Sequence, residues 1–359
     1  MKTQVRVPGK LYLAGEYAVV EAGYPALIAA INQYLTVTIE DSAQSSVYSS
    51  QQGVTVLWLR EGGRPIPKGE VTYPLIFSAI QIAETYASSV GQPPSCSYAL
   101  SVDSQLDDHQ SGVKYGLGSS GAVTVATIKA VLTFLGLNID AFRLYQLAAI
   151  AQLQLGMAGS FGDLAASSYG GVIAYRSVDR DWLKEVLGKH SLLEVLEMPW
   201  KDVAIERLNL PKTLSLLIGW TGRAASTARL VSQVGERRYR VGRDIAYRSF
   251  LEKSQLCLEG MIRSCHEQDA LAFQKGIAKN RRILQDFARN MELVIETPAL
   301  ATLCRLAEEE GAVAKSSGAG GGDCGICFIS QENQSEVICQ KWQTAGILPL
   351  DFAVADEVY

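Results

Sequence analysis

The sequence predicts an α+β protein made of two domains. Near the start of the chain, apolar residues alternate with other residues as they do in β-strands, and longer stretches further along repeat their apolar residues at helical spacing. In the second half the predicted elements run strand, helices, strand, helix, strand, an order that is typical of a sheet with helices on one face. At 359 residues the chain is also long for a single core.

In the first half, short alternating segments predict strands and longer periodic segments predict helices. Turns are expected at Pro8-Gly9 and at 21–23, and residues 60–71, which are rich in glycine and proline, are expected to form a loop. We predict strands at 5–7, 11–13, 35–39, 54–59, 96–102 and 172–175, and helices at 75–90, 123–135 and 141–155.

A domain boundary is predicted where the composition becomes charged and helical, at about residues 184–199. The two domains are then 1–190 and 191–359. In the second domain we predict strands at 214–220, 326–329 and 348–354, and helices at 240–265, 267–290, 298–310 and 332–345.

A glycine-rich loop at 116–122, with the sequence Gly-Leu-Gly-Ser-Ser-Gly-Ala, directly precedes the predicted helix 123–135. Glycine lets backbone N–H groups converge, and the first N–H groups of a helix have no partner within it, so such a loop favours a bound phosphate. By itself the loop is equally consistent with an ordinary glycine-rich start of a helix.

Other nucleotide-binding patterns fit this loop less well. The spacing of its glycines matches the dinucleotide fingerprint, but the polar segment 107–114 precedes it where that fingerprint requires an apolar strand. A phosphate-binding P-loop needs a lysine after its last glycine, and Gly121 is followed by alanine. The His-Arg-Asp and Asp-Phe-Gly tripeptides of protein kinases do not occur in the sequence.

Two further segments combine glycine with polar residues. The turn at 156–165 carries Ser160 and Asp163, and from these residues alone the favoured interpretation of the aspartate is the N-cap of a following helix. The segment 318–322 contains four glycines in five residues. Because glycine loses much freedom on ordering, and linkers seldom lie between a helix and a buried strand, we interpret this segment as a loop that approaches a ligand closely.

The charge of the chain argues against nucleic acid as the main partner, because its formal net charge is −4 and binding a phosphate backbone needs a basic face. The start of the chain lacks an apolar signal segment, and no charge-free apolar stretch is long enough for a membrane span. We therefore expect a soluble, cytoplasmic protein. Local arginines are interpreted as a solvated helix surface: Arg237, Arg238, Arg240 and Arg243.

The seven cysteines are scattered and odd in number, so they fit reduced thiols better than a disulfide framework. Cys324 and Cys327 have CxxC spacing, but no second pair lies nearby and the chain has three histidines in all. We interpret the two cysteines as core residues of a buried strand, with a metal or redox site as the less favoured alternative.

Three segments, in order along the chain, closely resemble the motifs of the GHMP small-molecule kinases: 10–17, 116–122 and 315–325. This superfamily includes galactokinase, homoserine kinase, mevalonate kinase and phosphomevalonate kinase, and the resemblance covers the whole chain. Within it, bacterial phosphomevalonate kinases are most similar in four places: Gly-Glu-Tyr at 15–17, 159–165, 219–222 and the third motif at 315–325. The resemblance implies an N-terminal domain like ribosomal protein S5 domain 2 and a ferredoxin-like C-terminal domain, with ATP and its acceptor in the cleft between them.

The resemblance also assigns roles to residues. It implies that Lys10 and Asp163 act in catalysis and that Ser120 ligates Mg²⁺ bound with ATP. The implied ATP-binding residues are Gly116, Leu117, Gly118, Ser119, Ser120, Gly121 and Ala122, and we add Lys114 because its place in the sequence would let it reach a phosphate. The implied acceptor-binding residues are Lys10, Tyr12, Glu16, Tyr17, Ser160, Trp220, Thr227, Ser317, Gly318 and Ala319. Three of these could equally be packing residues: Tyr12, Tyr17 and Trp220.

One departure from related kinases concerns the metal. Related mevalonate kinases supply a glutamate from the helix after the loop, where this chain has Gln152-Leu-Gln154, so Asp163 is the nearest candidate for a second metal contact. A phosphomonoester acceptor has its second ionisation near pH 6 and needs little deprotonation. We therefore predict that Lys10 matters more than Asp163, by screening two polyanions, while Asp163 orients the acceptor or the metal.

The activity implied by the resemblance is ATP-dependent phosphorylation of (R)-5-phosphomevalonate to 5-diphosphomevalonate, in the mevalonate pathway of isoprenoid biosynthesis. The implied partners are these small molecules, and the protein is expected to be a monomer or homodimer. Two alternatives stay open: a kinase for an alcohol such as mevalonate, homoserine or a sugar, and a non-catalytic ligand sensor on a kinase fold. The presence of Lys10, Ser120 and Asp163 together argues against the sensor.

Overall fold

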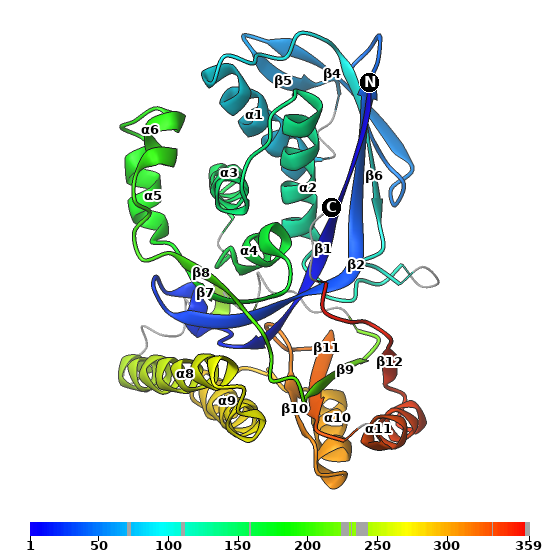
Figure 1. The fold of residues 1–359 in the computed structure, drawn as a ribbon, viewed down its shortest axis with the longest axis vertical. Helices are drawn as coiled ribbons and strands as arrows, with labels where there is room; N and C mark the ends of the chain where they lie inside the picture. The colour runs from blue at the N-terminus through cyan, green and yellow to red at the C-terminus, as the bar shows by residue number, and fades with distance from the viewer. Residues whose placement is uncertain are drawn as a thin grey trace.

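The computed structural model of this protein describes residues 1–69, 73–108, 112–157, 159–223, 230, 232–234, 243–331 and 333–355. Two bodies of helices and strands lie one above the other, and the first half of the chain forms the upper body (Figure 1). The predicted α+β class is confirmed.

The upper body is built on one large sheet. Among the described residues this sheet has eight strands, in the order β5-β4-β3-β6-β2-β7-β8, with β1 paired to β2 beside this path. The β3 and β6 strands pair in parallel, and β1 and β2 form the longest antiparallel pair. The strands are β1 (Lys2–Ala14), β2 (Pro25–Asp41), β3 (Ser46–Ser49), β4 (Val54–Glu61), β5 (Arg64–Pro67), β6 (Tyr98–Ser104), β7 (Val172–Arg176) and β8 (Ala204–Leu208).

Two expectations for this sheet were wrong, and two of its strands were not predicted. The expected turn at Pro8-Gly9 is a register shift inside the continuous strand β1. The glycine is needed there for close approach, because a Cβ on Gly9 would lie 2.9 Å from the carbonyl oxygen of Leu117. The expected loop 60–71 contains the strand β5, and the strands β3 and β8 were not predicted.

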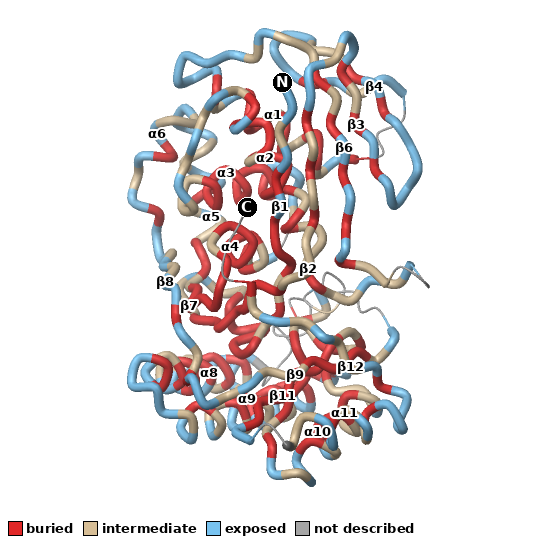
Figure 2. The backbone as a smooth tube through the Cα atoms, turned by 45° about the vertical axis from the view of Figure 1, so that its right-hand side comes forward, coloured by how far each residue is buried: buried red, intermediate tan, exposed pale blue. Residues whose placement is uncertain are grey.

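The helices of the upper body pack on one face of its sheet, where α2 lies against β1 and β2 (Figure 1). The side chains of α2 are buried nearly all round, because α1 and α3 cover the side away from the sheet (Figure 2). The helices are η1 (Ala18–Val20), α1 (Pro74–Ser89), α2 (Ser119–Phe134), α3 (Ala141–Gln154), α4 (Gly162–Tyr169), α5 (Arg180–Leu187) and α6 (Leu192–Glu197).

The lower body has a second, antiparallel sheet in the order β10-β11-β9-β12. Its strands are β9 (Ser215–Trp220), β10 (Val313–Ser316), β11 (Cys324–Ile329) and β12 (Leu348–Leu350). Its helices are α8 (Arg243–His266), α9 (Ala270–Met291), α10 (Pro298–Glu309) and α11 (Asn333–Thr344). Arg237, Arg238 and Arg240 lie outside the described residues. None of the described helices is both long and apolar enough to cross a membrane.

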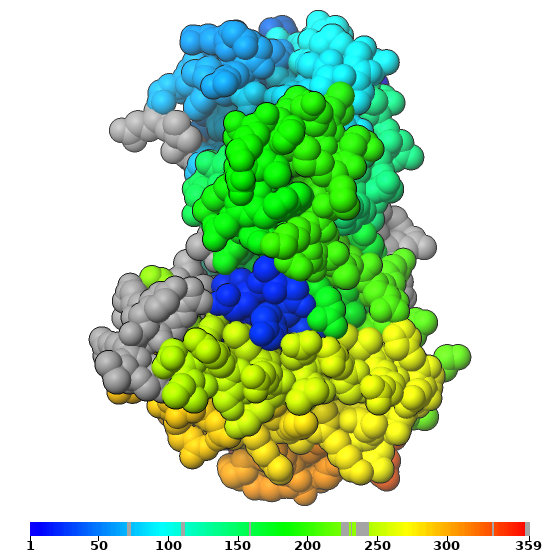
Figure 3. Space-filling view, turned by 90° about the vertical axis from the view of Figure 1, so that its left-hand side faces the viewer, coloured from blue at the N-terminus to red at the C-terminus, as the bar shows by residue number. Residues whose placement is uncertain are grey.

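The two bodies are joined at both ends of their interface. The segment after β12, which we predicted to continue as a strand, returns to the first sheet, where Asn32 N–H donates to the Ala353 carbonyl and Ala355 N–H to the Ala30 carbonyl, both at 2.9 Å. On another face, Tyr247 of α8 donates to Glu21 just after η1. Figure 3 shows the N-terminal part of the chain, in blue, between the green upper body and the yellow helices.

The division of the chain at residue 190 stays a prediction. Since β8 pairs with β7 of the first sheet, we propose a boundary between Leu208 and Ser215, with the last described residues returning to the first domain.

The CxxC cysteines lie in β11, and both are completely buried. Burial raises the pKa of each thiol well above its ordinary value. Among the described residues, no group of three or more His, Cys, Asp and Glu could hold a metal ion. This arrangement favours the core interpretation of the two cysteines.

We expect only the two half-buried cysteines, Cys96 and Cys339, to react rapidly with a thiol reagent in the native protein. The thiolate is the reactive form, and burial raises the pKa of Cys265 and Cys304 to about 12. A colorimetric thiol titration with and without denaturant measures both groups. Rapid reaction of Cys324 or Cys327 in the native protein would contradict the core interpretation. The same conclusion would follow if these two thiols reacted only after a chelator had been added.

Candidate active site

The glycine loop 116–122 is fastened to β1 through Lys10. The backbone N–H of Lys10 donates to the Leu117 carbonyl at 2.8 Å, and its ammonium group donates to the Gly116 carbonyl at 3.0 Å. Gly118 forms the N-cap of α2 with φ 77°, a left-handed conformation that glycine adopts at little cost. The loop therefore presents the start of α2 next to a lysine.

Three side chains approach the glycines of this loop so closely that a larger residue would overlap with them. A Cβ built on Gly118 would lie 2.9 Å from Cγ of Lys10, and one on Gly121 would lie 2.6 Å from Oδ2 of Asp163. A Cβ on Gly116 would lie 2.5 Å from Cγ of Asp323. Elements far apart in sequence thus converge on the loop.

Asp163 lies in the first turn of α4, but the N-cap of that helix is Phe161, so Asp163 is not the N-cap. Burial raises the pKa of the Asp163 carboxyl, while nearby Lys10 and hydrogen bonds from the backbone N–H groups of Leu164 and Gly121 oppose the rise. The carboxylate and the ammonium group therefore share one small polar space against the loop.

Part of the loop backbone is already used inside the protein. The Ala122 N–H donates to the Gly118 carbonyl at 3.0 Å, and the Gly121 N–H lies against Asp163. The N–H groups of Ser119 and Ser120 make no hydrogen bond to any described part of the chain. These two groups are the donors that a bound anion would meet at the positive end of α2.

Gln152, on α3, braces the loop from the side. Its amide nitrogen donates at 3.2 Å to the Ser120 carbonyl and at 3.2 Å to Oγ1 of Thr124. The Thr124 hydroxyl donates to the same Ser120 carbonyl at 2.9 Å. The glutamine at this position thus fixes the first turn of α2. The Ser120 hydroxyl and the Asp163 carboxylate carry oxygens of the kind that suits a metal ion.

The third motif faces the glycine loop across the interface between the two bodies. Asp323 lies against Gly116, and the Cys324 thiol donates to the Tyr115 carbonyl at 3.2 Å. From the first motif, the Tyr17 hydroxyl donates to the Ala319 carbonyl at 2.5 Å, and the Ser317 hydroxyl donates to the Tyr12 carbonyl at 2.8 Å. All three motifs therefore meet in one place.

Glu16 and Lys315 form a buried ion pair that joins the first motif to the third. Their side chains are 2% and 0% exposed, so both charges are removed from water. The Lys315 ammonium also donates to the Ser316 carbonyl at 2.6 Å, and Oε2 of Glu16 has no hydrogen-bond partner among the described residues. The pair belongs to the packing between the two bodies.

We expect Glu16→Gln to lower the free energy of unfolding by about 3–5 kcal/mol, because it leaves the Lys315 charge buried without a partner. The double variant Glu16→Gln/Lys315→Met should recover much of this loss. Equilibrium unfolding in urea measures both effects. Glu185→Gln, which removes a partner of exposed Lys189, is the matched control, and an equal loss in Glu16→Gln and Glu185→Gln would contradict the role of burial.

The turn before Asp163 is held by hydroxyl groups. Tyr12 and Ser160 hydrogen-bond through their hydroxyls at 2.8 Å, and the Tyr175 hydroxyl donates to the Ser160 carbonyl at 2.5 Å. The Tyr145 hydroxyl continues this chain to Tyr175 at 2.9 Å. These contacts set the position from which α4 presents Asp163.

Other predicted site residues lie differently. Trp220 is buried, and its ring lies 4.9 Å from that of Tyr115, which favours packing. Tyr17 is also buried, with its ring 5.2 Å from that of Phe287. Lys114 is exposed and pairs with Asp107 in an isolated β-bridge. Thr227 lies outside the described residues.

Sequence reasoning assigned no role to Asp323, Gln152 or Tyr175. Asp323 stands within the third motif, directly after its glycines, and that position was the available signal. Gln152 was noticed only as a departure from related kinases. Nothing in the sequence marks Tyr175, because it lies on an ordinary apolar strand.

A glycine loop at a helix start, a lysine and a carboxylate against it, and a second glycine-rich loop from another domain are features of a small-molecule kinase. The chain belongs to the GHMP kinase family. Residues 75–171 match the family model described as GHMP kinases N terminal domain, and residues 261–348 match the model described as GHMP kinases C terminal. The two-domain GHMP kinase fold predicted from the sequence is thus confirmed.

Relatives resemble the chain over its whole length. A phosphomevalonate kinase of Streptomyces sp. (strain CL190) is 38% identical over 99% of this chain and 98% of the relative. A crystal structure of the Lin0012 protein from Listeria innocua has a TM-score of 0.94 and 38% identity, over 100% of this chain and 99% of that one. The structure of Streptococcus pneumoniae phosphomevalonate kinase in complex with phosphomevalonate and AMPPNP has a TM-score of 0.85 and 29% identity, over 99% of both chains.

Proposed function

We propose that this protein is a phosphomevalonate kinase, which transfers the γ-phosphoryl group of ATP to (R)-5-phosphomevalonate and yields 5-diphosphomevalonate and ADP. The convergence of Lys10 and Asp163 on the glycine loop carries this proposal, in a chain 38% identical to a phosphomevalonate kinase along its length. The product would be an intermediate of isoprenoid biosynthesis. Cytoplasmic location and a monomeric or dimeric state remain predictions.

The protein contributes mainly position and positive charge to this reaction. A phosphate oxygen of the acceptor attacks the γ-phosphorus, and the bond to the β-phosphate oxygen breaks as ADP leaves. The N–H groups of Ser119 and Ser120 bind phosphate oxygens at the start of α2, and the Lys10 ammonium, which donates to the Gly116 carbonyl of the same loop, reduces repulsion between donor and acceptor. Little deprotonation is needed, so Asp163 serves to orient rather than to remove a proton.

The divalent metal that accompanies ATP would be Mg²⁺. The Ser120 hydroxyl and the Asp163 carboxylate are hard oxygen groups at the loop, and they fit such an ion. When bound, Mg²⁺ would neutralise charge on the phosphates of ATP.

Several predicted acceptor residues act, in this proposal, by shaping the third loop rather than by touching the acceptor. Glu16 holds Lys315, and Tyr17 holds Ala319. Gly318 differs from these residues, because a Cβ built on it would meet no atom within 4 Å. The open space beside Gly318 is the part of the third loop best able to admit a ligand.

A panel of acceptors tests the proposal. The purified protein is incubated with Mg²⁺, ATP and one of phosphomevalonate, mevalonate, homoserine or galactose, and ADP is followed by a coupled assay. We expect kcat/KM for phosphomevalonate to exceed that for each alcohol by at least about a hundredfold, because an acceptor phosphate matches the positive site. Faster turnover of an alcohol would support the alternative that the protein is a kinase for an alcohol. Nucleotide binding without any turnover would support the alternative of a non-catalytic ligand sensor.

A further inference from the structure

The glycines of the third motif are held from behind by a segment that belongs to none of the three motifs. The Gly321 N–H donates to the Ile295 carbonyl at 2.8 Å. A Cβ on Gly320 would lie only 2.3 Å from that same oxygen, so the two backbones are in direct contact. Ile295 lies in the connection between α9 and α10, and its position therefore sets the position of the glycines.

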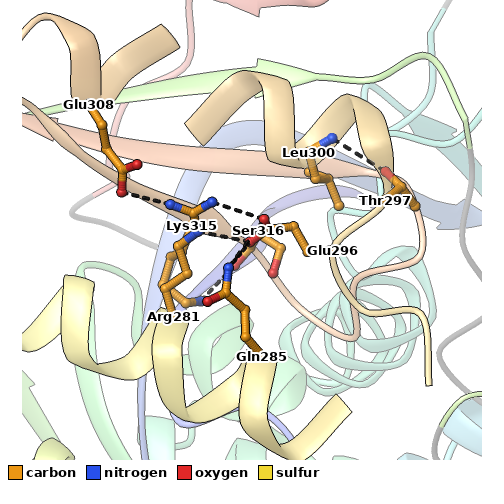
Figure 4. A network of polar contacts seen from close by, with 8 residues as sticks. All are labelled: Arg281, Gln285, Glu296, Thr297, Leu300, Glu308, Lys315 and Ser316. Carbon is orange, nitrogen blue, oxygen red and sulfur yellow. Dashed lines mark hydrogen bonds and ion pairs between the residues drawn. The ribbon is translucent and has the colours of Figure 1, made fainter. Parts of the chain in front are cut away.

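That connection is fastened to α9 by one arginine. Arg281 forms a two-pronged contact with Glu296, in which Nε lies 2.8 Å from Oε2 and Nη2 lies 2.9 Å from Oε1. Its third nitrogen reaches Glu308 of α10 at 2.6 Å (Figure 4). Arg281 thus links α9, the connection and α10 through a planar group whose geometry permits little rotation.

The connection between α9 and α10 is not packed against other residues on all sides. A cavity of about 490 Å³ lies beside it, and the lining includes Arg281, Ile295, Glu296 and Ser316. Gln285, one turn along α9 from Arg281, donates to both oxygens of Glu296 at 3.3 Å (Figure 4). Because part of the neighbouring space is open, the polar contacts to Glu296 add to the burial of Leu293 and Ile295 in holding the segment against α9.

From these contacts we infer that Arg281 is a positioning residue for phosphoryl transfer: it holds Glu296 and Ile295 and thereby fixes the glycines at 320–322 opposite the 116–122 loop. Tyr17 of the first motif hydrogen-bonds to the third loop at Ala319, and Ile295, which the Arg281 contacts hold in place, hydrogen-bonds to the same loop at Gly321. Asp323, which directly follows these glycines, lies against Gly116. A shift of Ile295 would therefore move the glycines and Asp323, and through Asp323 it would disturb the 116–122 loop. This inference rests on the proposed function for its kinetic part only.

A second partly buried Arg–Glu pair in the same chain provides a matched control. Arg60 of β4 contacts Glu84 of α1 with Nε at 3.1 Å from Oε2 and Nη2 at 2.6 Å from Oε1. The Glu84 side chain is 2% exposed, so breaking this pair should cost at least as much stability as breaking the Arg281 pair. None of the hydrogen bonds of Arg60 within the described residues reaches either glycine loop.

The experiment compares Arg281→Gln, Arg281→Lys and Arg60→Gln. Kinetics are measured with phosphomevalonate and Mg-ATP on folded protein, and hydrogen exchange is measured on peptides that span 317–323. We expect Arg281→Gln to lower kcat by at least tenfold and to speed exchange at Gly321, while Arg281→Lys, which keeps the charge, recovers part of both. Arg60→Gln should keep kcat within twofold and leave exchange at Gly321 unchanged.

Equal effects of Arg281→Gln and Arg60→Gln on exchange and on kcat would overturn the inference, since both would then reflect stability alone. If Arg281→Gln does not fold, Gln285→Ala takes its place, with a smaller expected rise in exchange at Gly321. Unchanged exchange in Gln285→Ala and Arg281→Lys would also overturn the inference. Hydrogen exchange is measured without any enzymatic turnover, so it tests the inference even if phosphomevalonate is not the acceptor. A wrong acceptor would be recognised separately, because the unsubstituted protein would then not turn over phosphomevalonate.

Discussion

Lys10→Met is expected to lower kcat by about a hundred- to a thousandfold, the usual effect of removing one preorganised charge or donor from a reacting anion. Lys10 is held between the loop and Asp163, and its ammonium is hydrogen-bonded to the Gly116 carbonyl. Asp163→Asn should cost less than about a hundredfold, which is the smallest effect typical of a lost general base. Steady-state kinetics with phosphomevalonate measure both variants.

The same pair of variants separates the two assignments of roles. A severe loss in Asp163→Asn with a mild loss in Lys10→Met would identify the aspartate as the base and contradict our assignment. Lys2→Met, at the exposed start of β1, controls for loss of a positive charge and should leave kcat unchanged. Unfolding curves of all three proteins exclude a general loss of folding.

The pH profile of Lys10→Met gives an independent check of the same geometry. Burial raises the pKa of Asp163, and the positive charge of Lys10 opposes that rise. Removing the charge should raise this pKa further, so the acidic limb of kcat/KM should move to higher pH. An acidic limb that stays in place would show that Asp163 does not control it.

Gly121→Ala is expected to lower kcat/KM by more than about a hundredfold, because small misplacements of reacting groups have effects of that size. The new Cβ would lie 2.6 Å from Oδ2 and 2.7 Å from Cγ of Asp163, and α4 holds that side chain from behind. The start of α2 must therefore move, and the N–H groups of Ser119 and Ser120 move with it. Steady-state kinetics and nucleotide binding by calorimetry measure the loss.

Gly260→Ala is the matched control for this substitution. Gly260 also lies inside a helix, α8, with no atom within 4 Å of an added Cβ. Alanine there should raise stability by about 0.5–1 kcal/mol without changing kinetics, since glycine is a poor helix former. If Gly121→Ala kept full activity, the closeness of Asp163 to the loop would have no functional meaning.

The local features of the chain were predictable from its sequence. The glycines and serines at 116–122 identify the start of a buried helix, and the long periodic segments identify α1, α3, α9 and α10 with small errors at their ends. These features depend on neighbours in sequence, through helix periodicity and the freedom of glycine. The short strands β3 and β5 were missed because few residues carry their signal.

Alone, the sequence determined the family-like order of three motifs and the start of the helix that can receive a phosphate. Only the tertiary structure shows that Asp323 lies against Gly116 and that Gln152 hydrogen-bonds to the Ser120 carbonyl. It also shows that Glu16 forms a buried ion pair. Pro8-Gly9 shows the reason: its glycine is required by Leu117, more than a hundred positions away, and not by a local turn. Contacts of this kind leave no period in the sequence, because each partner meets the other only after two separate elements have packed.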